Sequence, residues 1–233
     1  MLVGHVAVGL VGKRAAPKVS WGVLVLAALL ADLLWCVFMM AGIERLEIIQ
    51  PGTTLMNSAV TFQISYSHSL AIDGLWAGLF GGAYYLVRRD ARAAWVLAAA
   101  GLSHWLLDFI SHNPDMPLAP GVPKFYGLGL WNSIPATLAV EGSLWVAAVI
   151  LSARAMRYAF WIGVVVLTAA WWNNIAGPPP NPSAMGITSF IFFSLVVGWA
   201  YWIDPRSPSP SPPAPRAPAA PAHPIPPEHP RGT

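Results

Sequence analysis

Long apolar stretches separated by short polar connections make up most of the chain as far as residue 203. Six stretches are long enough to cross a bilayer as helices, because about 20 residues span its hydrocarbon core. They cover residues 19–42, 69–87, 93–111, 135–153, 158–174 and 184–203. A shorter apolar segment, residues 2–12, would rise only about 16 Å as a helix and is too short to cross. The pattern predicts an all-α, polytopic transmembrane helical bundle of about six spans plus a short N-terminal helix.

The first long stretch and the end of the chain need separate interpretations. Basic residues precede residues 19–42, as in a signal peptide, but no small-x-small cleavage site follows and the apolar run is too long. We therefore expect a retained span within a transmembrane domain of residues 1–203. In residues 204–233 prolines alternate with Ser and Ala, which predicts a disordered cytoplasmic tail. A proline-recognition module is a candidate partner for the tail, and an inert solvated tail is the alternative.

Composition supports a membrane protein. Hydrophobic residues make up 56% of the 233 residues and charged residues 10%, whereas a soluble domain carries about 25% charged residues. Cys36 is the only cysteine, which excludes an intrachain disulfide and a Cys-rich zinc motif. The formal net charge is only +3 and the basic residues lie at the edges of the apolar stretches, so we expect membrane lipids and no nucleic acid as partners.

The positions of the basic residues predict how the spans are oriented. One set of alternate connections contains Lys13, Arg14, Lys18, Arg88, Arg89, Arg92, Arg154, Arg157 and, after the last span, Arg206. The other connections, residues 43–68, 112–134 and 175–183, contain only Arg45 and Lys124. Because cytoplasmic loops carry the excess of Lys and Arg, we expect a multi-pass protein of the cytoplasmic membrane with both termini in the cytoplasm.

A histidine and an aspartate lie four residues apart within one of the predicted spans. His104 and Asp108 share one face of a helix at this spacing. A carboxylate at bilayer depth costs roughly 2.5 to 3.5 kcal/mol, so such residues usually bind an ion, relay protons or pair with each other. His112 continues the same face, where it could be an outer ligand, a substrate contact or a plain helix-end histidine. The pair predicts a buried metal or proton site.

Other ionisable residues lie at a similar depth in other spans. Counted from the basic residues at about 1.5 Å per residue, the residues about 18 to 24 Å inward are Asp32, Asp73, His104, Asp108 and Glu141. A shared polar centre would produce this agreement, although Asp73 could face elsewhere. His68 lies about 30 Å inward, at the mouth of its span, and His5 only about 12 Å.

Several of these residues also have simpler interpretations. His5 could be a packing residue in an interfacial helix, and His68 a boundary histidine in water. Ser67 or Ser69 could cap the helix that follows His68. Glu141 could be a ligand, a general base or a structural hydrogen-bonding group.

Four short motifs follow one another in a recognisable order. They are Gly4-His5, Leu30-Ala31-Asp32, Ser67-His68-Ser69 and the pair His104 and Asp108. Together they resemble the family of membrane-bound metal-dependent hydrolases of bacterial inner membranes, over roughly residues 1–155. Many relatives have Asp-x-Asp-His after the first span and His-Arg-Gly before the His-Ser motif, where this chain has Leu33-Leu34-Trp35 and Gln63-Ile64-Ser65-Tyr66. The resemblance therefore implies a hydrolase with fewer ligands.

These observations lead to one hypothesis and two alternatives. The hypothesis is a single-metal hydrolase within the membrane that acts on a lipid-like or phosphate ester substrate. The divalent metal would be bound by His5, His68 and His104 with Asp32 or Asp108, a ligand mixture that suits zinc ahead of manganese or iron. Asp108 or Glu141 would act in catalysis by accepting a proton. The alternatives are a small-molecule or proton-coupled permease and a structural membrane protein.

Overall fold

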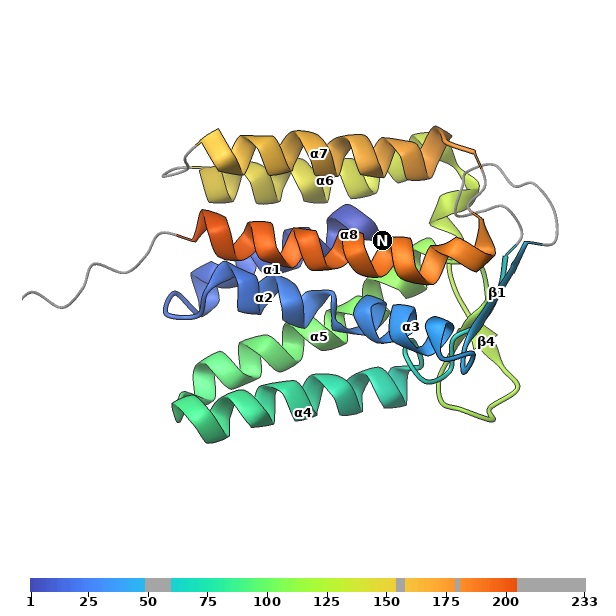
Figure 1. The fold of residues 1–233 in the computed structure, drawn as a ribbon, viewed down its shortest axis with the longest axis horizontal. Coiled ribbons are helices and arrows are strands. Elements are labelled where there is room, and N and C mark those ends of the chain that lie inside the picture. The colour runs from blue at the N-terminus through green and yellow to red at the C-terminus, as the bar shows by residue number, and fades with distance from the viewer. Residues whose placement is uncertain (49–59, 154–157, 179–180, 205–233) are drawn as a thin grey trace, which may run out of the picture.

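A computed structural model describes residues 1–48, 60–153, 158–178 and 181–204 (Figure 1). Eight α-helices make up most of this part of the chain. They are α1 (Leu2–Ala15), α2 (Trp21–Ala28), α3 (Leu30–Met40), α4 (Leu70–Arg88), α5 (Ala91–Ser111), α6 (Ile134–Ser152), α7 (Tyr158–Ala176) and α8 (Pro182–Ile203). Except for Asp204, the predicted tail lies outside the described residues.

The predicted all-α bundle of about six spans is confirmed. Helices α4 to α8 are each long and apolar enough to cross a membrane, whereas α2 and α3 pass that test only as a pair. This pair meets at 58°, so the first predicted span is broken at Leu29 rather than straight. Large apolar side chains such as Val87 and Trp95 are 79% and 76% exposed. Outward faces of this kind suit contact with lipid rather than with water.

Capping residues fix where several helices begin and end. Side-chain oxygens of Asp90, Ser133 and Asn181 accept backbone N–H groups in the first turns of α5, α6 and α8. Arg89 ends α4 in the left-handed conformation, with φ of 54°, and its N–H donates to the Tyr85 carbonyl. The short turn that follows folds α4 and α5 into an antiparallel hairpin.

Small residues let α4 and α5 approach each other closely. A Cβ atom added to Gly81 would lie 2.6 Å from the Ala94 carbonyl oxygen, and one added to Gly101 would lie 2.8 Å from the Ala77 Cβ. This close packing holds α5, which carries His104 and Asp108, in a fixed position against α4.

Helix α1 lies inside the bundle. It packs against α2, α5 and α6, and its residues Val3, His5 and Leu10 are buried. Figure 1 shows the α4–α5 hairpin on one side of α1 and α2, and α6 with α7 on the other. The N-terminus lies partway along the bundle rather than at either end (Figure 1). The predicted short N-terminal helix therefore brings its first residues to the depth of the spanning helices.

The two ends of the bundle differ. At one end, which we call the hairpin end, lie two short antiparallel hairpins and a 3-10 helix (Figure 1). These elements are β1 (Arg45–Ile48) with β2 (Val60–Gln63), β3 (Met116–Pro117) with β4 (Phe125–Tyr126), and η1 (Leu130–Asn132). At the other end, which we call the basic end, lie the α1–α2 and α4–α5 turns, with Lys13 and Arg89. The cytoplasmic assignment of the basic end remains a prediction.

Candidate metal centre

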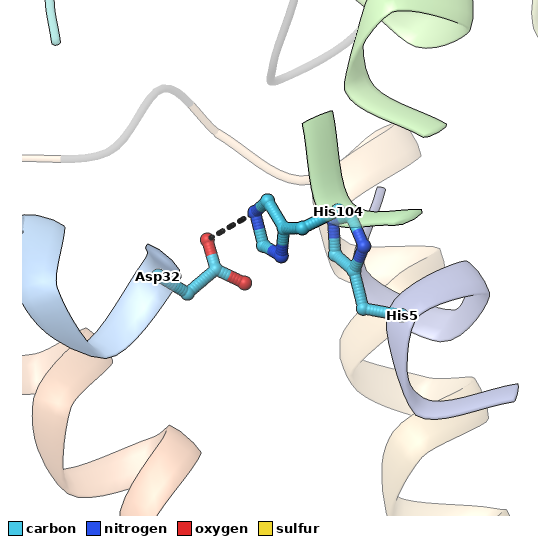
Figure 2. Close-up of side chains that lie close together, drawn as sticks. All are labelled: His5, Asp32 and His104. Carbon is cyan, nitrogen blue, oxygen red and sulfur yellow. Dashed lines mark ion pairs between the residues drawn. The ribbon is translucent and has the colours of Figure 1, made fainter. Parts of the chain in front are cut away.

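The structure brings all five predicted metal ligands together. His5 comes from α1, Asp32 from the first turn of α3, His68 from just before α4, and His104 and Asp108 from α5. Two sets of three have ligand atoms that all lie within 4.8 Å of one another: His5, Asp32 and His104, and His68, His104 and Asp108. Figure 2 shows the first set converging from three separate helices. Segments up to about a hundred residues apart thus form one cluster.

The separations between the ligand atoms suit a small tetrahedral ion. His104 Nε2 lies 3.2 Å from His68 Nε2 and 3.2 Å from Asp108 Oδ2, and His68 Nε2 lies 3.7 Å from the same carboxylate oxygen. Asp32 Oδ1 is 3.7 Å from both imidazole nitrogens. A tetrahedral zinc site with bonds of about 2.0–2.1 Å has ligand atoms about 3.3 Å apart. The donor set therefore has the composition and the spacing of a site that could hold a divalent metal ion.

The break between α2 and α3 orients His104. Because the helix bends after Ala28, the Ala28 carbonyl is turned toward a side chain, and it lies 2.8 Å from His104 Nδ1. A carbonyl oxygen can only accept, so Nδ1 carries a proton, and in the neutral imidazole Nε2 then presents its lone pair to the cluster. Metal-binding histidines commonly have their second nitrogen fixed in this way.

A hydrogen-bond relay from Glu44 through Ser67, both outside the predicted spans, orients His68. Glu44 is buried, and its two oxygens accept from the backbone N–H groups of Tyr66 and Ser67 and from the Ser67 hydroxyl at 2.7 Å. The Ser67 hydroxyl proton is thus used, so Ser67 Oγ accepts from His68 Nδ1, which lies 2.7 Å away. His68 Nε2 then also presents a lone pair to the cluster. Ser69 is the N-cap residue of α4, as the sequence suggests, but its side chain makes no capping hydrogen bond.

Two imidazole lone pairs and two carboxylates therefore face one another in a buried space. His5, His104 and Asp108 are each at most 2% exposed. Within the described residues, no Lys or Arg forms an ion pair with Asp32 or Asp108, which pair with histidines and with the Met1 α-amino group. The Met1 α-amino group balances one of the two carboxylate charges, so the buried cluster favours further positive charge. A divalent metal would supply that charge.

His5 approaches the cluster from the opposite side of His104. Its ring stacks on the His104 ring, with centroids 3.7 Å apart and planes 7° from parallel. His5 Nε2 lies 3.1 Å from Asp108 Oδ1, and the Met1 nitrogen lies 2.6 Å from the same oxygen and 3.0 Å from His5 Nε2. Among the described residues, His5 Nδ1 has no hydrogen-bond partner although it is buried. Nothing in the sequence predicts the contact with Met1.

The remaining ionisable residues surround the cluster without joining either ligand set. Glu141 is buried and its Oε1 accepts from Trp131 Nε1 at 2.7 Å. Asp73 Oδ2 accepts from the backbone N–H of Trp105 at 3.2 Å, on the α5 turn that carries His104. His112 Nε2 lies 4.0 Å from Asp108 Oδ2, and its Nδ1 lies 3.1 Å from Asp115 Oδ1.

Comparisons with protein-family models, with curated proteins and with solved structures found no match to this chain.

Proposed function

We propose that the protein is an integral membrane metal-dependent hydrolase that binds a single divalent ion, with zinc as the first candidate. The observation that carries the proposal is the arrangement of His68 Nε2, His104 Nε2 and Asp108 Oδ2, which lie 3.2–3.7 Å apart with both imidazole lone pairs directed at the same point. The resemblance of the sequence motifs to membrane-bound metal-dependent hydrolases supports the same conclusion.

The contacts of each cluster residue indicate whether it would bind the metal ion or accept a proton. His68, His104 and Asp108 would hold the ion, with Asp32 or His5 as the fourth ligand. A bound zinc ion lowers the pKa of a water molecule to about 7 and polarises the group that is to be hydrolysed. Both carboxylate oxygens of Asp108 have partners: Oδ2 contacts His104, and Oδ1 contacts Met1 and His5. It therefore serves better as a ligand than as a base.

Glu141 is the better candidate for accepting the proton. It is buried beside the cluster, belongs to neither ligand set, and accepts at Oε1 from Trp131. A carboxylate can accept several hydrogen bonds, so Glu141 can hold a water molecule while Trp131 fixes its orientation. The substrate would be a lipid-like or phosphate ester, because the site lies within the apolar bundle.

One observation favours a second candidate, a small-molecule or proton-coupled permease. The break between α2 and α3 lies next to the cluster, and transporters often build ion sites at broken helices. Here the carbonyl freed at the break orients His104, which is the arrangement expected of a metal ligand.

Metal content separates these candidates. We expect the protein purified in detergent to hold about one zinc ion per chain, and both His104→Ala and Asp108→Ala to lose it. The matched control, His223→Ala, removes a tail histidine and should keep the full zinc content. A wild-type protein that holds no first-row metal, with uptake into proteoliposomes that depends on Asp32 or Glu141, would establish the permease instead.

A further inference from the structure

An apolar groove runs along helix α1. Helices α5 and α6 both pack against α1 but, among the described residues, hardly contact each other, so α1 forms the floor of the groove and α5 and α6 form its walls (Figure 1). Its volume is about 470 Å³. Every described residue that lines it is Gly, Ala, Val or Leu, so the groove offers no polar side chain to a ligand. Ala99 and Ala147 are exposed in its walls, which leaves the groove open to the surroundings of the bundle.

One end of the groove lies beside the metal centre. On α1 the lining ends at Gly4, directly before a histidine of the cluster. On α5 it ends at Leu107, the chain neighbour of Asp108. On α6 it ends at Leu144, which lies one helical turn from Glu141 and on the same face. All three surfaces of the groove therefore lead toward the same group of buried polar residues.

The other end of the groove lies at the basic end of the bundle. There the lining includes Ala15, at the end of α1, and Val96, in the second turn of α5. Gly4 and Ala15 are about 16 Å apart at a rise of about 1.5 Å per residue. The hydrocarbon core of a bilayer is about 30 Å thick, so each leaflet, and one extended lipid chain, accounts for about half of that. The groove therefore has the length of a single lipid chain.

The surroundings of the groove also favour a lipid chain as its occupant. Helices α5 and α6, which form its walls, are both long and apolar enough to cross a membrane. The groove would then open sideways into the hydrocarbon of the bilayer. Lipid chains are as apolar as Leu side chains, so a chain can move from the bilayer into the groove without meeting water or a polar group.

We propose that the groove holds one hydrocarbon chain of a lipid whose polar end lies at Glu141 and the metal centre. The inference rests on the proposed hydrolase function and narrows its substrate to a lipid with at least one extended chain. Because the chain runs from the centre toward the basic end, the polar end of the lipid points toward the hairpin end. The substrate therefore comes from the leaflet on the hairpin side of the membrane.

Photo-labelling of the full-length protein in detergent micelles tests both the groove and the direction of the chain. The two probes are hexadecanols, which a hydrolase cannot cleave, with a diazirine either at the end of the chain or beside the hydroxyl group. Mass spectrometry locates the labelled residues after irradiation. We expect the chain-end probe to label near Ala15 and Val96, and the hydroxyl-side probe to label near Leu107 and Leu144. Unlabelled hexadecanol should compete with both probes, because the groove holds one chain whereas the outer surface holds many.

Two substitutions that fill the groove sharpen the test. Ala99→Phe and Ala147→Phe each place a ring in it from a different wall, and each should abolish competable labelling by the chain-end probe. Both positions are exposed, so neither substitution disturbs the buried core. Ala169→Phe, at an exposed position of α7 outside the groove, is the matched control and should be labelled as wild type is. Zinc content should stay unchanged in all three variants, because no candidate ligand lines the groove.

The outcomes also separate this inference from the proposed function. Labels spread over all exposed helix faces, labels that unlabelled hexadecanol does not displace, or a reversed order of the two probes along α1 would overturn the inference and leave the hydrolase in place. An unlabelled groove in a dimeric wild type would show that a second copy of the chain covers it, which would overturn the inference as well. A wild-type protein that holds no zinc, with the groove labelled as expected, would instead overturn the proposed function.

Discussion

Charged groups at the two ends of helix α1 differ in how they are paired and in how deeply they are buried. At the basic end, Lys13 Nζ donates to the Val19 carbonyl at 2.7 Å and pairs with Asp204 at 2.9 Å. Both side chains remain partly exposed, at 22% and 18%. Opposite charges there satisfy each other. At the other end, His5 is 1% exposed and adjoins a cluster whose imidazoles and carboxylates face one another.

We interpret the ion pair between Lys13 and Asp204 as a structural contact and the cluster around His104 as a functional one. A partly exposed ion pair between two segments of the chain is complete in itself and contributes little, typically under about 1 kcal/mol. The cluster around His104 is buried and holds two carboxylates against the single Met1 α-amino group, so an added cation would stabilise it. If this contrast is correct, changes at the two ends of α1 should affect different measurements.

The largest effect is expected from Glu141→Gln. This change keeps the size of the side chain and its contact with Trp131 but removes the ability to accept a proton. Under the proposed hydrolase function, we expect kcat for hydrolysis of a lipid-like or phosphate ester to fall by about 10² to 10⁴, the usual contribution of a general base, with zinc content unchanged. Asp90→Asn is the matched control, because Asn caps the start of α5 as well as Asp does. Loss of zinc together with activity would show that Glu141 is a ligand.

The next effect tests how His68 is oriented. Ser67→Ala removes the hydroxyl that links Glu44 to His68 and leaves the tautomer of the imidazole unfixed. We expect zinc affinity, measured by competition with a chelator, to fall by about 10 to 100-fold. Ser69→Ala removes a neighbouring buried hydroxyl with no hydrogen-bond partner among the described residues, and should bind zinc as wild type does. Equal affinities for the two variants would rule out the relay.

The sequence predicts those features that depend on local helical geometry. The six spans match the observed helices closely, because about 20 apolar residues suffice to identify a span. Counting residues from the basic ends placed Asp32, His104 and Asp108 at one depth, because the rise of a helix is constant. The spacing of His104 and Asp108 put both on one face for the same reason.

Features that depend on tertiary contacts were not predicted. Nothing in Ala28-Leu29-Leu30 signals a broken helix, since it contains neither Pro nor Gly; the Ala28 carbonyl at the break bonds His104, far along the chain. Glu44 was missed because it lies 23 residues from Ser67. Pairing of Arg45 with Gln63 in the β1–β2 hairpin brings the two segments together, and strand register of this kind depends on partners distant in the sequence.

The smallest effect is expected at the basic end, and it completes the comparison. Lys13→Met removes the ion pair with Asp204 but keeps the apolar stem against Trp21, whose ring lies 5.2 Å from the Lys13 nitrogen. We expect a loss of stability below about 1 kcal/mol, measured by thermal unfolding in detergent. Adding zinc should raise the unfolding temperature of Lys13→Met and of wild type by the same amount, and should leave His104→Ala unchanged, because only a ligand that binds the native state stabilises it. A zinc shift that vanished in Lys13→Met would mean that the two ends of α1 are coupled, and the contrast between a self-contained ion pair and a cation-dependent centre would fail.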